Sequence, residues 1–189
     1  MRKIAVTGRL AVGKSTVCRI LKEYGAYVIN ADEIVDRLLS PYTTTGKKVV
    51  ELLGSDIVVQ NQIDKKKISK IVFSDSNKLN ALEKILHPSV KQEIEKLYNT
   101  VKDDHSYKFF VAEIPLLFEA GMEKDFDTVI TVTADVEIAR RRFGKDYFEE
   151  RQKRQLPPDT KASKSHFVIT NNSDLNALKS SIQKIMDTL

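Results

Sequence analysis

Five short apolar runs rich in β-branched residues alternate with amphipathic segments along the chain. Each run is predicted to be a buried strand. The runs are residues 3–7, 27–29, 109–112, 128–133 and 167–169. Helical periodicity follows them, as in residues 15–24, where Val17, Ile20 and Leu21 share one face. Because buried strands alternating with helices are typical of parallel sheets, we expect an α/β fold: a doubly wound, five-stranded parallel sheet in three layers.

The stretch between the second and third predicted strands, residues 33–100, is rich in helical patterns and has no strong strand. Asp64 stands where it can cap a helix. Pro88 falls inside the next helical pattern, which predicts a break or kink near His87. No flexible linker flanks the stretch, so we expect a helical insert within a single domain over residues 1–189.

The composition is typical of a soluble globular protein, with 41% hydrophobic and 30% charged residues. The net charge of +5 suits anionic small molecules, but the basic residues are too dispersed to indicate nucleic acid. Cys18 is the only cysteine, which fits a reducing cytoplasm and a packing role for its thiol. With no signal peptide or membrane-spanning run, we expect a cytoplasmic protein without a membrane partner. The oligomeric state stays open.

The most informative motif is residues 8–16, G-R-L-A-V-G-K-S-T, which fit the phosphate-loop pattern G-x-x-x-x-G-K-[ST]. A predicted strand precedes it and a predicted helix follows, as the motif requires. Gly8 and Gly13 permit backbone torsions and close approaches that side chains would block. The N–H groups of the loop, which includes Ala11 and Val12, then face a polyphosphate.

Three further residues of the motif have expected roles in binding ATP and Mg²⁺. Lys14 reaches the β- and γ-phosphates, and the Ser15 hydroxyl is a ligand for Mg²⁺. Thr16 lies one residue into the helix, where its N–H meets the α-phosphate. Arg9 occupies a free position of the pattern, where it either adds positive charge to the phosphate site or faces solvent.

Polar residues gather where the predicted strands end. Gly8, residues 30–32, Glu113 and Asn171 all follow or close a strand, so they are expected at one edge of the sheet, where ligands bind in such folds. Asp32 either accepts a proton from an attacking hydroxyl or assists Mg²⁺, or it simply caps the following helix.

Several further segments are more specific than the phosphate loop. They are G-A…N-A-D at residues 25–32, L-E-K-I-L-H-P at 82–88, E-I-P-L-L-F-E at 113–119, the pair Arg151 and Gln155, and V-I-T-N at 168–171. In this order, over nearly the whole chain, they strongly resemble the dephospho-coenzyme A kinase family. The resemblance implies a P-loop kinase with a nucleotide core, a helical substrate-side insert at residues 33–100 and a lid at residues 140–160.

The resemblance also implies the reaction, which is transfer of the ATP γ-phosphoryl group to the 3′-hydroxyl of dephospho-coenzyme A. By resemblance, Asp32 is the catalytic base or orients the hydroxyl, and Lys14 and Arg141 stabilise the transferring phosphoryl group. Asn171 is expected near the ATP adenine. Arg140 and Arg142 are expected to face solvent.

For the acceptor, the resemblance places His87 in the binding pocket, although a helix-breaking His-Pro pair fits the same residues. An apolar wall for the adenine or pantetheine arm is expected from the run after the third strand, unless these side chains only fill the core. This run is Pro115, Leu116, Leu117 and Phe118.

The chain departs from the family pattern at several positions, which suggests a divergent member. In the middle of the phosphate loop, residues 9–12 replace a section in which the family usually has two glycines. Asn30 and Glu113 each stand where the family has Asp. The lid is several residues short, with Lys145 where its second arginine is expected. Ser-His at 165–166 replaces Ala-Asp.

Two other functions fit parts of this pattern. One is a different small-molecule kinase of the same architecture, acting on a nucleoside or a nucleoside monophosphate. The other is a nucleotide-binding switch that has no acceptor, which would suit the altered loop. The H-P and I-P-L-L-F-E segments argue against the first function, and the second predicts nucleotide binding without acceptor-dependent turnover.

Overall fold

The computed structural model describes residues 1–144, 148–153 and 155–189. It divides into two compact units. The first comprises Met1–Asn30 and Tyr98–Leu189, and the second is Ala31–Leu97. Each unit has its own cluster of buried hydrophobic side chains. Among the described residues, none of the helices combines the length and the hydropathy that crossing a membrane requires.

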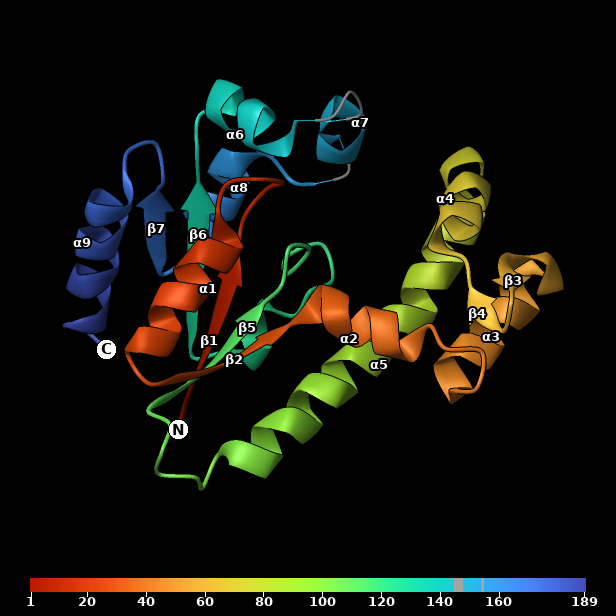
Figure 1. The fold of residues 1–189 in the computed structure, drawn as a ribbon, viewed down its shortest axis with the longest axis horizontal. Coiled ribbons are helices and arrows are strands. Elements are labelled where there is room, and N and C mark those ends of the chain that lie inside the picture. Colours follow the sequence, from red (N-terminus) through yellow and green to blue (C-terminus); the bar gives the residue numbers. More distant parts are fainter. Residues whose placement is uncertain (145–147, 154) are drawn as a thin grey trace. The chain divides into compact units, whose positions relative to one another are not determined.

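A five-stranded sheet forms the centre of the first unit (Figure 1). Its strand order is β2-β5-β1-β6-β7, and all neighbouring strands are parallel. The strands are β1 (Arg2–Thr7), β2 (Ala26–Asn30), β5 (Phe109–Glu113), β6 (Thr128–Thr133) and β7 (Phe167–Thr170). In the central strand, Ile4, Ala5 and Val6 have no exposed surface, which explains its unbroken apolar run. The predicted α/β fold with a five-stranded parallel sheet is confirmed.

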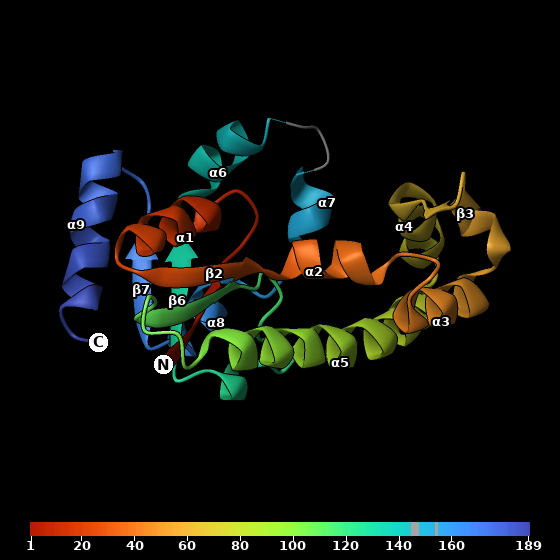
Figure 2. The ribbon, with the colours of Figure 1, turned by 60° about the horizontal axis from the view of Figure 1, so that its bottom comes forward.

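Helices cover both faces of this sheet, with α1 on one side and α8 on the other (Figure 2). The helices of the unit are α1 (Lys14–Glu23), α6 (Val136–Phe143), α7 (Phe148–Gln152), α8 (Pro158–Ser163) and α9 (Leu175–Met186), with a 3₁₀ turn at Glu123–Asp125. Val17 and Leu21 of α1 are fully buried on the sheet, as their spacing predicted. Asp174 caps α9 by accepting a hydrogen bond from the N–H of Ala177.

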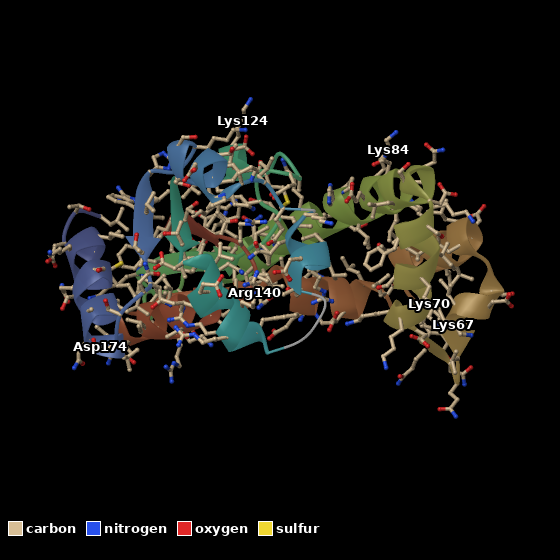
Figure 3. All side chains as sticks on the ribbon, turned by 90° about the horizontal axis from the view of Figure 1, so that it is seen from above. Lys67, Lys70, Lys84, Lys124, Arg140 and Asp174 are labelled. Atoms are coloured by element: carbon tan, nitrogen blue, oxygen red, sulfur yellow. The ribbon has the colours of Figure 1, made fainter. Side chains whose placement is uncertain are left out.

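The second unit is mainly helical. Its elements are α2 (Ala31–Leu38), α3 (Thr44–Leu53), a 3₁₀ turn (Ser55–Ile57), β3 (Val58–Val59), β4 (Gln62–Ile63), α4 (Lys65–Ser74) and most of α5 (Ser76–Val101). Lys67 and Lys70 are exposed on α4 (Figure 3), and Nζ of Lys67 donates a hydrogen bond to the carbonyl oxygen of Asp56 at 2.7 Å. Side chains at the helix starts explain where α3, α4 and α5 begin, because Thr43, Asp64 and Asp75 each accept hydrogen bonds from the first turn.

A short antiparallel hairpin of β3 and β4 was missed by the sequence analysis. Each of its strands has two residues, which is too short to produce an alternating pattern. Its turn residues, Gln60 and Asn61, have φ angles of 49° and 61°. Two successive residues with positive φ are typical of a type I′ turn, which joins strands of this kind.

Helix α5 is 26 residues long and continues through Pro88, so the predicted break near His87 is wrong. Proline removes one helical hydrogen bond from the ladder. The next residue, Ser89, donates its hydroxyl to the carbonyl oxygen of Ile85 at 3.0 Å. Ser89 also accepts a hydrogen bond from the buried Thr45 of α3 at 3.0 Å. Packing within the second unit therefore stabilises α5 beside Pro88, where a helical hydrogen bond is missing.

Candidate active site

The phosphate loop, residues 8–13, connects β1 to α1 and can be built only with glycine at both ends. Gly8 has a φ of 143°, and a Cβ atom there would lie 2.2 Å from the backbone oxygen of Val132. Gly13 has a φ of 99°, and its Cβ would lie 2.3 Å from Nδ2 of Asn171. The loop is thus pressed against the carboxyl ends of β6 and β7, as the motif requires.

Ala11 keeps the loop conformation although it lacks the freedom of glycine. Its φ is 60°, in the left-handed region where the resemblance predicted a glycine. Alanine at this position therefore adopts a backbone conformation that favours glycine.

Lys14 begins α1 and is almost fully buried, with 8% of its surface exposed. Its Nζ donates a hydrogen bond to the carbonyl oxygen of Arg9 at 2.9 Å, across the loop. The N-cap residue of α1 is Gly13, which has no side chain with which to cap the helix. The first N–H groups and the lysine together form an anion-binding arrangement. The N–H of Thr16, expected to meet a phosphate, donates to the Gly13 oxygen at 3.1 Å in this structure.

Glu113 lies beside the predicted metal ligand, a contact that the sequence analysis did not foresee. The hydroxyl of Ser15 donates to Oε1 of Glu113 at 3.1 Å, and Nδ2 of Asn30 donates to Oε2 at 3.3 Å. Parallel pairing brings Asn30 of β2 next to Glu113 of β5. In the sequence, the sign that Glu113 could belong to the site was its position at the end of a predicted strand. The replacement of Asp by Asn at position 30 thus supplies a donor that holds this carboxylate.

This donor set fits Mg²⁺, which prefers carboxylate and hydroxyl oxygens and keeps several water and phosphate ligands. Ser15 is exposed and Glu113 is 6% exposed, so the hydroxyl oxygen faces solvent in front of a buried carboxylate. The part of the chain that the structure describes contains no cluster of three or more His, Cys, Asp or Glu residues. A Mg²⁺ ion at this place would therefore take its remaining ligands from nucleotide and water.

The carbonyl oxygen of Val12 is the point where two later segments hold the loop. Nδ2 of Asn171 donates to it at 2.9 Å and Nη1 of Arg142 at 3.4 Å. Asn171 is 7% exposed, so its amide supports the loop from behind. Arg142 is exposed, as expected, and in addition its guanidinium group reaches the loop.

The other two arginines of α6 have different surroundings. Arg140, labelled in Figure 3, forms ion pairs with Glu137 at 2.9 Å and with Glu149. The hydrogen bond to Glu149 raises the pKa of the guanidinium group of Arg140. Arg141 is exposed on the same helix. Lys145, the predicted second lid cation, lies outside the described residues, and Arg151 is exposed on α7.

The segment after α6 also touches the loop. Nη2 of Arg9 donates to the carbonyl oxygen of Gln152, the last residue of α7, at 2.7 Å. The N–H of Leu10 donates to Oε1 of Gln155 at 2.9 Å. Of the two placements considered for Arg9, neither anticipated this contact with the lid segment.

The apolar run after β5 divides into buried and partly exposed residues. Leu117 has no exposed surface and Phe118 has 7%, so both belong to the core of the first unit. Pro115 and Leu116 are half-buried and retain surface for contact with a ligand. The carbonyl oxygen of Pro115 accepts hydrogen bonds from Thr7 and Lys161.

Asp32 and His87 belong to the second unit. Asp32 is the second residue of α2, follows the end of β2 directly in the chain, and is exposed. His87 is half-buried in α5, immediately before Pro88. Cys18 packs in the core of the first unit, where burial raises the pKa of its thiol well above the usual range. A buried thiol of this kind is unreactive, as predicted.

A parallel sheet of this order with a phosphate loop after its central strand defines the class of P-loop kinases. A family model described as dephospho-CoA kinase matches residues 2–177. The chain belongs to the dephospho-CoA kinase family, whose members are ATP-dependent phosphotransferases that act on an alcohol group.

Relatives with this name match over most of their length. The chain is 44% identical over 196 residues to a dephospho-CoA kinase of Protochlamydia amoebophila, covering 100% of this chain and 97% of the relative. It is 40% identical over 188 residues to that of Chlamydia pneumoniae, covering 96% and 93%. The solved dephospho-CoA kinase from Campylobacter jejuni superimposes with a TM-score of 0.71 at 25% identity, covering 98% of this chain and 95% of that one.

Proposed function

We propose that this protein transfers the γ-phosphoryl group of ATP to the 3′-hydroxyl of dephospho-coenzyme A, giving coenzyme A and ADP. The observation that carries the proposal is the phosphate loop, which keeps its required backbone at Gly8, Ala11 and Gly13 despite the altered middle. Membership of the family supplies the acceptor.

ATP binds with its phosphates on residues 8–16, where loop N–H groups and the start of α1 offer donors. Lys14 leaves the oxygen of Arg9 and contacts the β- and γ-phosphates. Arg141, on the exposed side of α6, adds positive charge over the transferring group. Charge stabilisation and positioning are the main contributions that a protein makes to phosphoryl transfer.

The Ser15 hydroxyl and the adjacent Glu113 carboxylate would hold Mg²⁺. When bound, the ion neutralises charge that develops on the phosphate oxygens. Glu113 is held for this purpose by Asn30, at 3.3 Å.

Candidate contacts for the acceptor occur in each unit separately. Asp32 orients the ribose 3′-hydroxyl and accepts its proton, which is the task of a carboxylate in this class of reaction. His87 in the second unit, and Pro115 and Leu116 in the first, are candidate acceptor contacts. The lid at residues 140–160 excludes water during transfer.

The test measures ADP release by purified protein with ATP and Mg²⁺, with and without dephospho-coenzyme A. AMP, CMP, dTMP and adenosine serve as alternative acceptors in parallel. We expect release that depends on dephospho-coenzyme A, with coenzyme A identified as the product by chromatography. Turnover with another acceptor would overturn the substrate assignment. ATP binding without turnover by any acceptor would overturn the assignment as a kinase and favour a nucleotide-binding switch.

A further inference from the structure

Lys161 of α8 is a charged residue that the proposed reaction does not use. Its side chain has no exposed surface, and its Nζ lies 2.9 Å from Oε1 of Glu119. It also donates to the carbonyl oxygen of Pro115 at 2.8 Å. Burial lowers the pKa of the Lys161 ammonium group, while its hydrogen bond to Glu119 opposes this shift. Glu119 is 17% exposed.

Stability alone does not account for an ion pair in this place. Removing two charges from water costs several kcal/mol per ion, and apolar side chains of similar volume often stabilise a core as well or better. Lys161 lines a small pocket together with the buried apolar residues Val132 and Ala139, so apolar replacements would be accommodated. A further task for the pair is to hold other groups in place.

Glu119 binds the main chain at Leu156, near the end of the lid segment at residues 140–160. One of its oxygens accepts a hydrogen bond from the N–H of Leu156 at 2.8 Å. The residue before it, Gln155, accepts the N–H of Leu10 in the phosphate loop at 2.9 Å. An unbroken series of contacts thus runs from Lys161 through Glu119, Leu156 and Gln155 to the loop.

Two other contacts connect the same segment to the loop. Gln152 accepts a hydrogen bond from Arg9 at 2.7 Å. Lys161, Gln152 and Pro158 also line a small pocket whose other side includes Gly8, Arg9 and Val12. The first half of the phosphate loop, which lacks the flexibility of glycine at residues 9 and 11, is therefore supported from the lid segment.

We propose that Glu119 and Lys161 are positioning residues for ATP, which set the conformation of the phosphate loop through the contact between Gln155 and Leu10. Neither residue touches the nucleotide. The inference rests on the proposed function only in taking ATP as the ligand of the loop. Its test measures ATP binding without any acceptor, so that failure of the acceptor assignment would leave the test unaffected.

The decisive variant is the double replacement Glu119→Leu with Lys161→Met, which removes both charges together and keeps the volume. We expect its melting temperature to stay near that of the original protein, while its Kd for MgATP, measured by calorimetry, rises roughly threefold to tenfold. In the presence of dephospho-coenzyme A, we expect the KM for ATP to rise by the same factor, with kcat changed less than twofold.

A double-mutant cycle tests the route of the effect. Glu119→Gln weakens the hold on Leu156, and Gln155→Ala removes the acceptor for the Leu10 N–H. If Glu119 and Gln155 act on the loop through one contact, the Kd of the combined variant for ATP is about equal to the larger of the two single-variant Kd values. Effects on Kd that multiply would overturn the proposed route.

Two controls separate positioning from stability. Glu23→Gln makes the same chemical change in an exposed ion pair with Lys179 and is expected to leave the Kd unchanged. Phe126→Leu lowers core stability just before β6, at the opposite end of that strand from the loop, and is also expected to leave the Kd unchanged. The proposal is overturned if the Leu/Met variant binds MgATP as the original protein does. If that variant does not fold, the cycle with Glu119→Gln decides alone.

Discussion

At the scale of the residue, Ala11 shows that the loop's conformation does not depend on a glycine at that position. Its φ of 60° costs an L-residue about 1 kcal/mol. Glycine would remove this strain but would lose about as much free energy through the entropy of the unfolded chain. We therefore predict that Ala11→Gly changes the free energy of unfolding, measured in urea, by less than about 1 kcal/mol and retains ATP binding.

Gly8→Ala is the matched comparison for this prediction. Its Cβ would lie 2.2 Å from the Val132 oxygen, and the backbone of β6 cannot move away cheaply. ATP affinity is expected to fall at least tenfold in this variant. Equal ATP affinities for the two variants would contradict this account of the loop.

Asp32 is the residue on which the proposed chemistry depends most. Asp32→Asn keeps the size and hydrogen-bonding capacity of the side chain but removes the proton acceptor. We predict a fall in kcat of about 10²- to 10⁴-fold with dephospho-coenzyme A, because general-base catalysis typically contributes that factor. The Kd for MgATP should stay unchanged. A variant that folds, binds ATP and turns over at the original rate would exclude Asp32 as the base.

At the scale of the element, α5 contains a proline that its helix does not need. An interior proline costs about 3 kcal/mol relative to alanine, and the Ser89 bond to Ile85 offsets part of this. We predict that Pro88→Ala raises the free energy of unfolding by about 1–2 kcal/mol, measured in urea. Ser89→Ala is the control and should lower it. A loss of stability in Pro88→Ala would show that proline is required for the packing of α5.

The start of β7 depends on an unusual hydrogen-bond acceptor. His166 accepts the N–H of Val129 at its Nδ1 atom, and its own N–H donates to the Val129 oxygen, both at 3.0 Å. The resemblance predicted an Asp here, and its carboxylate would accept the same N–H. We predict that His166→Ala lowers the free energy of unfolding by about 1–2 kcal/mol. His166→Asp should lower it clearly less; equal losses would contradict this role.

Elements were predictable from the sequence where their causes are local. Strand positions follow from apolar runs, and Asp64 was correctly placed at a helix start because caps act within one turn. The continuity of α5 was not predictable, because it depends on a contact with Thr45, 44 residues away from Ser89.

The same distinction applies to the candidate site. The motif identified the loop residues, since their roles are fixed by spacing. The contact between Ser15 of α1 and Glu113 of β5 joins residues 98 positions apart in the chain, so it depends on tertiary packing. The contacts of Arg142 and Gln152 with the loop also depend on tertiary packing, and no local pattern encodes them.

At the scale of the whole molecule, the chain passes twice between its two compact units. The first passage joins the end of β2 directly to α2, and the second lies within α5. The two units have separate cores, so their local stabilities can be measured separately. The match over residues 2–177 covers both of them.

Hydrogen exchange should distinguish the two ligands by unit. We predict that MgATP slows exchange in residues 8–16 of the first unit, because their amides bind phosphate. Dephospho-coenzyme A should slow exchange in α2 and α5 of the second unit, which contain the proposed acceptor residues Asp32 and His87. The measurement is mass spectrometry of peptides from each unit, with free phosphate as the control. Protection of the first unit alone by dephospho-coenzyme A would contradict an acceptor role for the insert.

The bond between Lys14 and the Arg9 oxygen has a consequence for how nucleotide affinity is interpreted. Because Nζ of Lys14 has an oxygen partner within the protein, a phosphate that contacts this lysine replaces an internal hydrogen-bond acceptor. The heat of binding is then a difference between two sets of similar contacts and is smaller than the contacts with ATP alone suggest. An inhibitor that displaced Lys14 from the Arg9 oxygen without offering an equivalent hydrogen-bond acceptor would therefore lose affinity.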